Sequence, residues 1–416
     1  MTLFAPRYET MPRAELEQLQ LERLQALLVR LKRNVRRYRE KLGGERVESL
    51  ADLARLPLTT PEDMAESFPY GMFAFPLREV IRLHTTVGPG GRPLVIGHTR
   101  NDLVQWSRLA ARQLSACGVT ANDVVQISLG GGIYPGASGY LLGAELIEAS
   151  VIADDPNHID YQLAMLQNYR PTILVTTPAN ARDLMRRLEQ RRMDPQSFHL
   201  RTVLLSRPVD QGIREQISAG LFTSVRCSFG LGEVLDPGLC VECDQGQFHV
   251  QEDHFLAECV EGELVLTTLT REAMPLLRYR TRVAGELDRE KCACGRTGII
   301  LKPGARLDRR LLVNETPLYE RQIAEVLAQT RVARQPFEAE ARERCLVIRV
   351  QMNADLFSDT IWVIEKLRND IQAEFLTRLG IEAEVRFVEP RSWPDGNTRR
   401  APVQGTRPPG AGLAPV

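Results

Sequence analysis

The chain has 416 residues, of which 43% are hydrophobic, 25% charged and 6% aromatic, the composition of a soluble globular protein with two or three cores. Its 53 Lys and Arg residues balance 53 Asp and Glu residues. Zero net charge argues against a protein that binds nucleic acid by neutralising phosphates. The sequence has neither an apolar run of about 18 residues nor an apolar N-terminal segment. We therefore expect no membrane span, no signal peptide and a cytoplasmic location.

The first predicted elements are helices. Leucines at helical spacing predict a helix over 13–41 that packs by one face. Thr60, followed by Pro61 and two acidic residues, predicts the start of another helix. Between about 80 and 235 strand and helix patterns alternate, which predicts a mostly parallel sheet with helices on both faces. The expected strands are 124–129, 150–154, 172–177 and 202–206, and the expected helices 136–148, 158–168, 179–191 and 209–220.

The second half of the chain has a different pattern. Short alternating strands over 236–300, such as 262–269, predict an antiparallel region. A strand-like segment ending at Val313 begins a new α+β pattern with helices at 318–329 and 358–379 and strands at 345–352 and 382–388. The predicted fold class is α/β, with a large domain over 1–303, a small α+β domain over 304–390 and a Pro-, Gly- and Arg-rich tail over 391–416.

The cysteines that lie in two tight pairs suggest a metal site, because tight pairs in a cytosolic chain favour metal over disulfide. Three thiolates and one imidazole form the Cys₃His set of a closed structural zinc site. The candidate ligands, which flank the predicted antiparallel strands within 240–294, are Cys243, His249, Cys292 and Cys294. Cys240 is an alternative ligand, His254 a less suitable one, and four reduced structural cysteines are the competing interpretation.

Many segments occur in an order that resembles one family. They include SLADLARLPLTTPEDMAESFPYGMFAFPLREVIRLH, GHTRNDLVQW, GAELIEASVI, FGLGEV, GELVLTTLTREAMPLLRYRTR and CACGRTG. Together they resemble the phenylacetate–coenzyme A ligase family of adenylate-forming enzymes over residues 8 to about 400. The resemblance implies a large adenylate-forming domain with a small lid domain. It also implies that ATP and Mg²⁺ activate an aryl or acyl carboxylate to an acyl-adenylate, which passes to coenzyme A. Many relatives carry matching cysteines, which agrees with zinc.

The resemblance assigns a phosphate loop to residues 85–93. Such a loop wraps phosphates with hydroxyls, backbone N–H groups and a cation. The matching binding residues here are Thr86, Gly88, Gly91 and Arg92. Val87 stands where a hydroxyl is expected, and Pro89 and Gly90 stand where threonines are expected. We therefore expect weakened binding of the ATP phosphates; the competing interpretation is a tight surface turn.

The Mg²⁺ and adenine motif of the family matches Phe229-Gly230-Leu231-Gly232-Glu233. The resemblance implies that Phe229 stacks on adenine, that Gly230 belongs to the nucleotide site, and that Glu233 is catalytic through the oxygen ligand that Mg²⁺ prefers. A buried aromatic residue and a solvated glutamate are the competing interpretation. The ribose motif ends in Val283 where the family has Asp, so the paired hydrogen bonds to ribose hydroxyls are missing.

The remaining family motifs fall near the small domain. Arg306 and Asp308 match the hinge and nucleotide-binding segment, although a charged linker would look the same. The family's adenylation lysine has no counterpart, because the matching stretch reads Asp395-Gly396-Asn397-Thr398-Arg399-Arg400 and no lysine follows Lys366. Arg399 and Arg400 are the candidate catalytic cations, although Arg and Lys are not equivalent at such sites.

The acyl pocket is assigned by the resemblance to residues 128–145. The candidate lining residues are Leu129, Gly132, Tyr134 and Gly136. Several family positions that are polar or aromatic become aliphatic here, so we expect a more apolar cavity: Ile127, Leu129, Leu141 and Leu142. A helix start packed in the core is the competing interpretation.

Two functions therefore compete. The first is a divergent aryl- or acyl-coenzyme A ligase, favoured by Glu233, Arg306 and Asp308. The second is an impaired member of the family that binds a ligand or a partner, favoured by Val283 and Asn397. In either case we expect a small-molecule carboxylate as the partner, no nucleic acid and no membrane, with a homodimer as the assembly to be considered.

Overall fold

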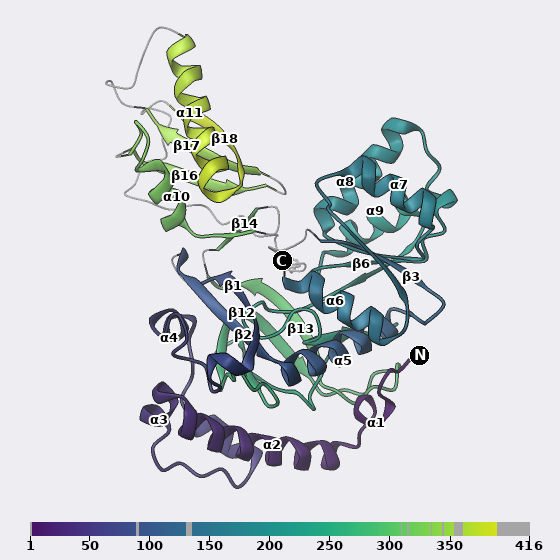
Figure 1. The fold of residues 1–416 in the computed structure, drawn as a ribbon, viewed down its shortest axis with the longest axis vertical. Helices are drawn as coiled ribbons and strands as arrows, with labels where there is room; N and C mark the ends of the chain where they lie inside the picture. Colours follow the sequence, from purple (N-terminus) through teal and green to yellow (C-terminus); the bar gives the residue numbers. More distant parts are fainter. Residues whose placement is uncertain are drawn as a thin grey trace, which may run out of the picture. The chain divides into compact units, whose positions relative to one another are not determined.

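The protein is described by a computed structural model that covers residues 2–88, 91–129, 135–308, 310–313, 316–333, 335–342, 345–352 and 361–388. The chain divides into two compact units, Met1–Gly88 with Pro93–Gly304 and Pro89–Arg92 with Ala305–Val416 (Figure 1). No helix in these described ranges combines the length and apolar character needed to cross a bilayer.

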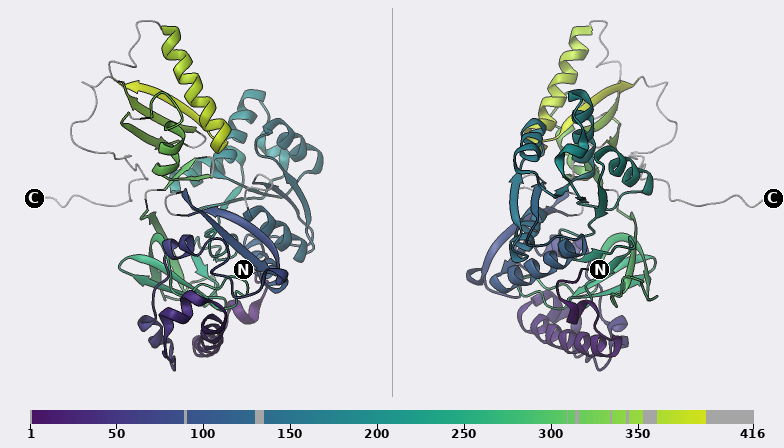
Figure 2. Two further views of the ribbon diagram at one scale, coloured as in Figure 1. Left: turned by 60° about the vertical axis from the view of Figure 1, so that its left-hand side comes forward. Right: turned by 90° about the vertical axis from the view of Figure 1, so that its right-hand side faces the viewer.

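The N-terminal helices form the base of the first unit (Figure 2). The predicted helix over 13–41 is two helices, because Val35 adopts an extended conformation (φ −113°, ψ 111°) and interrupts it. The start at Thr60 is confirmed, since its side chain accepts a hydrogen bond from the Asp63 N–H in a capping box. The helices of this region are α1 (Pro6–Glu9), α2 (Arg13–Asn34), α3 (Arg36–Leu42), η1 (Leu50–Arg55), α4 (Pro61–Glu66) and η2 (Leu77–Glu79).

Helix α2 is tied to a segment far along the chain. Arg13 forms an ion pair with Glu252, with N···O distances of 2.9 and 2.6 Å. The Gln20 amide donates to the Glu252 carbonyl at 2.9 Å. Glu252, the partner of both residues, lies just before the strand that begins at Phe255, so the helix supports the antiparallel part of the unit.

A five-stranded parallel sheet in the order β4-β3-β5-β6-β7 confirms the predicted α/β pattern. Val125 and Ile127 pack into an apolar cluster with α5 and α6, whereas Leu174 and Val203 face the other side, where α8 packs. The strands are β3 (Val124–Ser128), β4 (Ser150–Asp154), β5 (Ile173–Thr176), β6 (Thr202–Leu205) and β7 (Ser224–Cys227). The helices are α5 (Arg100–Ala116), α6 (Pro135–Leu146), α7 (Ile159–Tyr169), α8 (Pro178–Arg191), η4 (Pro195–Phe198) and α9 (Gln211–Leu221).

The predicted antiparallel region is a six-stranded sheet in the order β10-β11-β12-β13-β9-β8. Its strands are β8 (Cys240–Glu242), β9 (Phe248–Val250), β10 (Phe255–Val260), β11 (Glu263–Thr268), β12 (Tyr279–Asp288) and β13 (Ile300–Arg306). A separate antiparallel pair consists of β1 (Val80–Val87) and β2 (Pro93–Thr99), with Thr86 opposite Leu94. The described part of the first unit thus contains a parallel sheet, an antiparallel sheet and a separate two-stranded hairpin.

The second unit has its own apolar cluster, which includes Ile348, Ile371 and Phe375. Strand β17 pairs antiparallel with β16 and parallel with β18, so the sheet is mixed. The elements are β14 (Leu311–Val313), β15 (Thr316–Leu318), α10 (Glu320–Leu327), β16 (Phe337–Ala341), β17 (Cys345–Gln351), α11 (Ile361–Leu379) and β18 (Glu382–Val388).

Candidate active site and metal centre

The Phe229–Glu233 motif follows β7 directly and therefore lies at the carboxyl edge of the parallel sheet, where ligands of such sheets bind. Phe229 is buried and meets Phe248 edge-on, with ring centroids 6.5 Å apart. Gly230 allows the Asp236 side chain to approach the backbone closely, because a Cβ on residue 230 would lie 2.4 Å from Asp236 Oδ1. Glu233 is also buried, at 8% exposure. The motif is a compact turn in the first unit rather than a solvated strand end.

Strand β1 brings part of the predicted phosphate loop to this motif. Thr86 Oγ1 lies 3.5 Å from the position that a Cβ on Gly232 would occupy. Gly88 packs closely on β2, because a Cβ there would lie 2.6 Å from Leu94 Cγ. Two segments separated by about 145 residues thus meet, as the predicted nucleotide site requires.

The other phosphate-loop residues either belong to the second unit or lie outside the described residues. Gly91 and Arg92 group with the second unit, and Gly91 has a positive φ of 79°. Pro89 and Gly90, where the sequence departs from the family, lie outside the described residues.

A pair of histidines, which sequence analysis missed, links β1 to the motif. His84 Nε2 lies 3.4 Å from the Gly232 carbonyl oxygen, and His84 Nδ1 lies 3.3 Å from His98 Nε2. His98 stacks on Trp106, with ring planes 9° apart and centroids separated by 5.0 Å. Both rings carry their proton on Nε2 if His98 donates to His84 and His84 donates to Gly232. The signal in the sequence is the alternation of residues 80–87, which places His84 and Thr86 on one face.

Burial keeps this histidine pair neutral. Desolvation, reinforced by the charges of Arg271 and Arg82, lowers the pKa of His84 to about 4. Desolvation also lowers the pKa of His98, and the charges of the same arginines and of His84 lower it further. The pair therefore holds its hydrogen bonds in the neutral form throughout the usual working range of pH.

We expect the stability of the protein to fall between about pH 6.5 and pH 4, in part through His84. The unfolded chain binds a proton at His84 below pH 6.5, whereas the folded chain resists it until about pH 4. Protonation therefore favours unfolding by up to about 3 kcal/mol for this group. Urea unfolding of the wild type and of His84→Gln at pH 7.5, 6 and 5 measures the effect. The loss on acidification should be smaller in the variant, and parallel profiles would contradict the assignment.

The ribose position is apolar in the structure as well as in the sequence. Val283 lies on β12, is 3% exposed and belongs to the main apolar cluster of the unit. It shares the buried face of the strand with Tyr279 and Thr281. Farther along the strand, Asp288 pairs with Lys302 at 3.3 Å. No carboxylate therefore occupies position 283 to receive ribose hydroxyls.

The predicted acyl-pocket residues are only partly described. Leu129 is buried at the end of β3, and Gly136 lies in the first turn of α6. Gly132 and Tyr134 lie outside the described residues. Helix α6 packs tightly on α5, because a Cβ on Gly139 would lie 2.6 Å from Trp106 Nε1. The acyl segment therefore adjoins the same tryptophan that stacks on His98.

The hinge candidates lie in the second unit. Arg306 and Asp308 form a bidentate ion pair with two N···O distances of 2.8 Å. The Tyr319 hydroxyl donates to Asp308 at 3.4 Å. Burial raises the pKa of Asp308, but the hydrogen bond and charge of Arg306 outweigh it, so the pKa is lowered. Arg399 and Arg400 lie outside the described residues.

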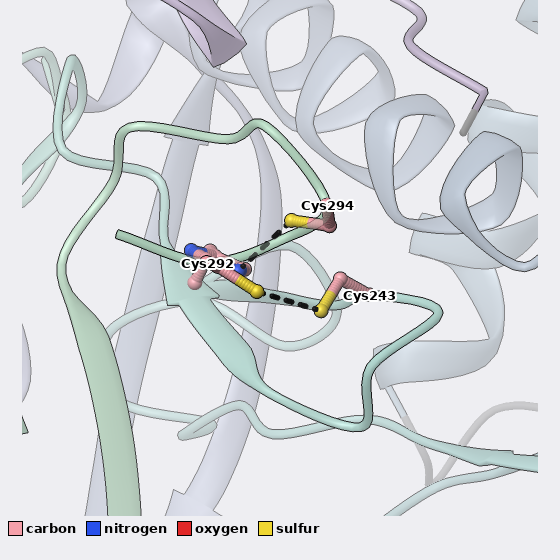
Figure 3. Close-up of side chains that lie close together, drawn as sticks. Cys243, Cys292 and Cys294 are labelled. Atoms are coloured by element: carbon pink, nitrogen blue, oxygen red, sulfur yellow. Dashed lines mark hydrogen bonds between the residues drawn. The ribbon is translucent and has the colours of Figure 1, made fainter. Parts of the chain in front are cut away.

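The predicted metal residues come together in one cluster. One donor atom each from Cys243, His249, Cys292 and Cys294 lies within 4.8 Å of the others. Figure 3 shows the three sulfur atoms facing one centre, with Cys243 Sγ 3.8 Å from Cys292 Sγ. Cys294 Sγ lies 3.3 Å from His249 Nε2. This arrangement could hold a metal ion.

Two short turns position these donors. Cys243 begins the β8–β9 turn, in which its N–H donates to the Gln247 carbonyl at 2.9 Å. Cys292 and Cys294 lie in a second turn, which the Gly295 N–H closes on the Cys292 carbonyl. His249 Nδ1 lies 2.8 Å from the Gly298 carbonyl oxygen, which leaves Nε2 to face the sulfurs. A backbone partner on the second ring nitrogen is typical of a metal-bound histidine.

The alternative ligands lie elsewhere. Cys240 is fully buried in the apolar cluster of the first unit. His254 Nδ1 lies 2.6 Å from Thr270 Oγ1. Neither residue belongs to the cluster of four.

Comparisons with known proteins agree with the fold and with the family resemblance. No protein-family model matches the chain. The phenylacetate-coenzyme A ligase of Thermus thermophilus is 33% identical over 407 residues, which are 92% of this chain and 90% of that protein. The enzyme of the same name from Aromatoleum evansii is 31% identical over 402 residues, 90% of this chain and 91% of that protein.

A solved structure shows the same fold. The structure of a 2-hydroxyisobutyryl-CoA ligase in complex with 2-HIB-AMP and CoA superimposes with a TM-score of 0.85 at 24% identity, covering 95% of this chain and 91% of that one. Together with the identity and coverage of the curated relatives, this fold leads to one conclusion. The chain belongs to the phenylacetate–coenzyme A ligase family of adenylate-forming enzymes.

Proposed function

We propose that this protein activates an aryl or acyl carboxylate with ATP and transfers the acyl group to coenzyme A. In the first step the carboxylate oxygen attacks the α-phosphate of ATP, which forms an acyl-adenylate and releases pyrophosphate. In the second step the thiol of coenzyme A displaces AMP and gives the thioester. The observation that carries this proposal is the meeting of Thr86 with the Phe229–Glu233 motif at the carboxyl edge of the parallel sheet.

Each residue of the motif has a role that its environment supports. Phe229 offers an aromatic face for adenine, and Glu233 offers a carboxylate for Mg²⁺. That ion, when bound, would offset the charge of the phosphates. Thr86 contributes a hydroxyl and Gly88 a close backbone approach for the β- and γ-phosphates. The buried position of Glu233 strengthens its electrostatic contribution, since charges interact more strongly away from water.

The second unit would act as the lid. Arg306 and Asp308 would form its hinge. Arg399 and Arg400 would supply the cation that the family draws from a lysine. Arginine holds a fixed positive charge and a planar donor pattern, so it can contact the developing charge but in a different geometry.

The metal centre is proposed to be a structural zinc site. Three sulfurs and one nitrogen form a soft donor set of the kind that zinc prefers, and all four positions are filled by protein. Burial raises the pKa of the Cys243 thiol to about 12, and a bound cation would favour its thiolate form. A closed ligand set leaves no open position for substrate, which supports a role in folding rather than in the reaction.

ATP–pyrophosphate exchange tests the proposed function directly. Purified protein is incubated with ATP, Mg²⁺, labelled pyrophosphate and phenylacetate, and then with coenzyme A to detect the thioester. Exchange that depends on the carboxylate supports a ligase. Val283 is the observation that favours the alternative, a binding protein, because it removes the ribose contact. Calorimetric binding of phenylacetate without any exchange would favour that alternative.

A further inference from the structure

We propose that His84 is a positioning residue, which holds the peptide before Glu233 so that the Glu233 carboxylate can bind Mg²⁺. This inference rests on the proposed function and adds to it a residue that acts through the backbone of the motif rather than through a contact with the nucleotide. It is carried by a chain of contacts that runs from Trp106 through His98 and His84 to the Gly232 carbonyl.

The peptide that joins Gly232 to Glu233 depends on a contact from outside its turn. Two backbone hydrogen bonds close the turn, from the Leu231 N–H to the Leu235 carbonyl at 3.0 Å and from the Val234 N–H to the Leu231 carbonyl at 2.9 Å. Neither of these two bonds uses the Gly232 carbonyl. Glycine has more conformational freedom than other residues, so this peptide rotates at low cost unless another group holds its carbonyl.

His84 supplies that contact from strand β1. Its Nε2 lies 3.4 Å from the Gly232 carbonyl oxygen. Because the peptide unit is planar, the direction of this carbonyl also sets the positions of the Glu233 N and Cα atoms. The contact therefore orients the Glu233 side chain, as the hydrogen-bond partners behind a metal ligand orient that ligand.

The hydrogen bonds determine which ring nitrogen of His84 carries the proton. A carbonyl oxygen only accepts, so His84 Nε2 is the donor to Gly232. In the neutral ring Nδ1 is then an acceptor, and it receives the hydrogen bond from His98 Nε2 at 3.3 Å. Burial, which lowers the pKa of His84 to about 4, keeps the ring neutral. His98 thus selects the form of His84 that donates to the turn.

The ring of His98 is itself held in place. It is 1% exposed and stacks on Trp106, with ring centroids 5.0 Å apart. The Trp106 Nε1–H donates to the Pro237 carbonyl at 2.9 Å, which ties the stack to the segment that follows the motif. His98 therefore presents its Nε2–H to His84 from a fixed position.

Calorimetric binding of ATP at increasing Mg²⁺ concentration tests the inference independently of turnover. His84→Phe keeps an aromatic ring but removes the donor, so it should raise the Mg²⁺ concentration for half-maximal ATP binding by about 10-fold or more. In pyrophosphate exchange the KM for Mg²⁺·ATP should rise with it, whereas the KM for phenylacetate should not change. His84→Gln returns an N–H donor to the end of the side chain and should recover most of the wild-type affinity.

His98→Phe provides a second test in a variant that retains the stack on Trp106. It removes the hydrogen bond that selects the donating form of His84, so it should raise the Mg²⁺ requirement by a smaller factor than His84→Phe. In the His84→Phe background it should have no further effect, because both histidines act through one contact.

The matched control is His254→Phe. His254 is also buried, and its Nδ1 lies 2.6 Å from Thr270 Oγ1, outside the motif. Its replacement should lower the melting temperature and leave the Mg²⁺ requirement unchanged. A wild-type Mg²⁺ requirement in His84→Phe or in His98→Phe, or additive effects of the two changes, would overturn the inference alone. Wild-type protein that neither binds ATP with Mg²⁺ nor exchanges pyrophosphate would overturn the proposed function.

Discussion

Replacing Cys292 by Ser is expected to lower the free energy of unfolding by about 4 kcal/mol or more, because loss of a structural metal is among the most destabilising single changes. The half-buried Cys292 would join the 292–295 turn to the β8–β9 turn through a bound metal ion, and the serine hydroxyl that replaces its thiol is a poor ligand for zinc. Thermal unfolding and elemental analysis of metal-replete protein measure the two effects together. We expect about one zinc per wild-type chain and much less in the variant.

The matched control is Cys259→Ser. Cys259 is exposed and lies on β10, away from the cluster, so its replacement should change neither the zinc content nor the melting temperature appreciably. Wild-type protein that is folded and holds no zinc would refute the proposed metal centre. A variant whose melting temperature equals that of the wild type would show that the cluster does not stabilise the fold.

Replacing Glu233 by Gln should reduce pyrophosphate exchange by about 100- to 1000-fold, the range observed when one electrostatic contact to a developing charge is removed. The amide retains the volume of the side chain but not the charge that binds Mg²⁺. Exchange rates at increasing Mg²⁺ concentration measure the effect, and the variant should need more Mg²⁺ than the wild type.

Glu215→Gln is the control for this change. Glu215 is exposed on α9, where it accepts a hydrogen bond from Gln211 at 2.7 Å, and it lies outside the nucleotide motif. Its replacement should leave exchange unchanged. If Glu233→Gln retained the wild-type rate and Mg²⁺ dependence, another carboxylate would hold the ion, and the role given to Glu233 would be wrong.

Local patterns in the sequence predicted local structure well. The alternation of strands and helices over 124–221 is confirmed in the parallel sheet, and the helix start at Thr60 carries the expected capping box. These features depend on residues that are close in sequence. The prediction of a single helix over 13–41 was wrong, because the helix breaks at Val35. This break arises from packing, since Val35 is completely buried.

Contacts between distant segments were harder to predict. The spacing of Cys243, His249, Cys292 and Cys294 indicated a cluster, since ligand chemistry restricts which residues can meet. The alternation of residues 80–87 places His84 on the same face as Thr86, but it does not show that His84 reaches Gly232, 148 residues later, because that contact depends on how the β1–β2 hairpin packs against the turn that follows β7.

The hydrogen bond from Gln20 to Glu252 spans 232 residues and has a consequence for synthesis on the ribosome. At about 5–20 residues per second, helix α2 waits roughly 10–50 s before the segment that buries it has been made. During that time its leucines, which are buried in the finished protein, have no native partner in the 252 region. Slow translation would lengthen this interval, so chaperones that bind exposed apolar segments should associate with nascent chains that end before residue 252.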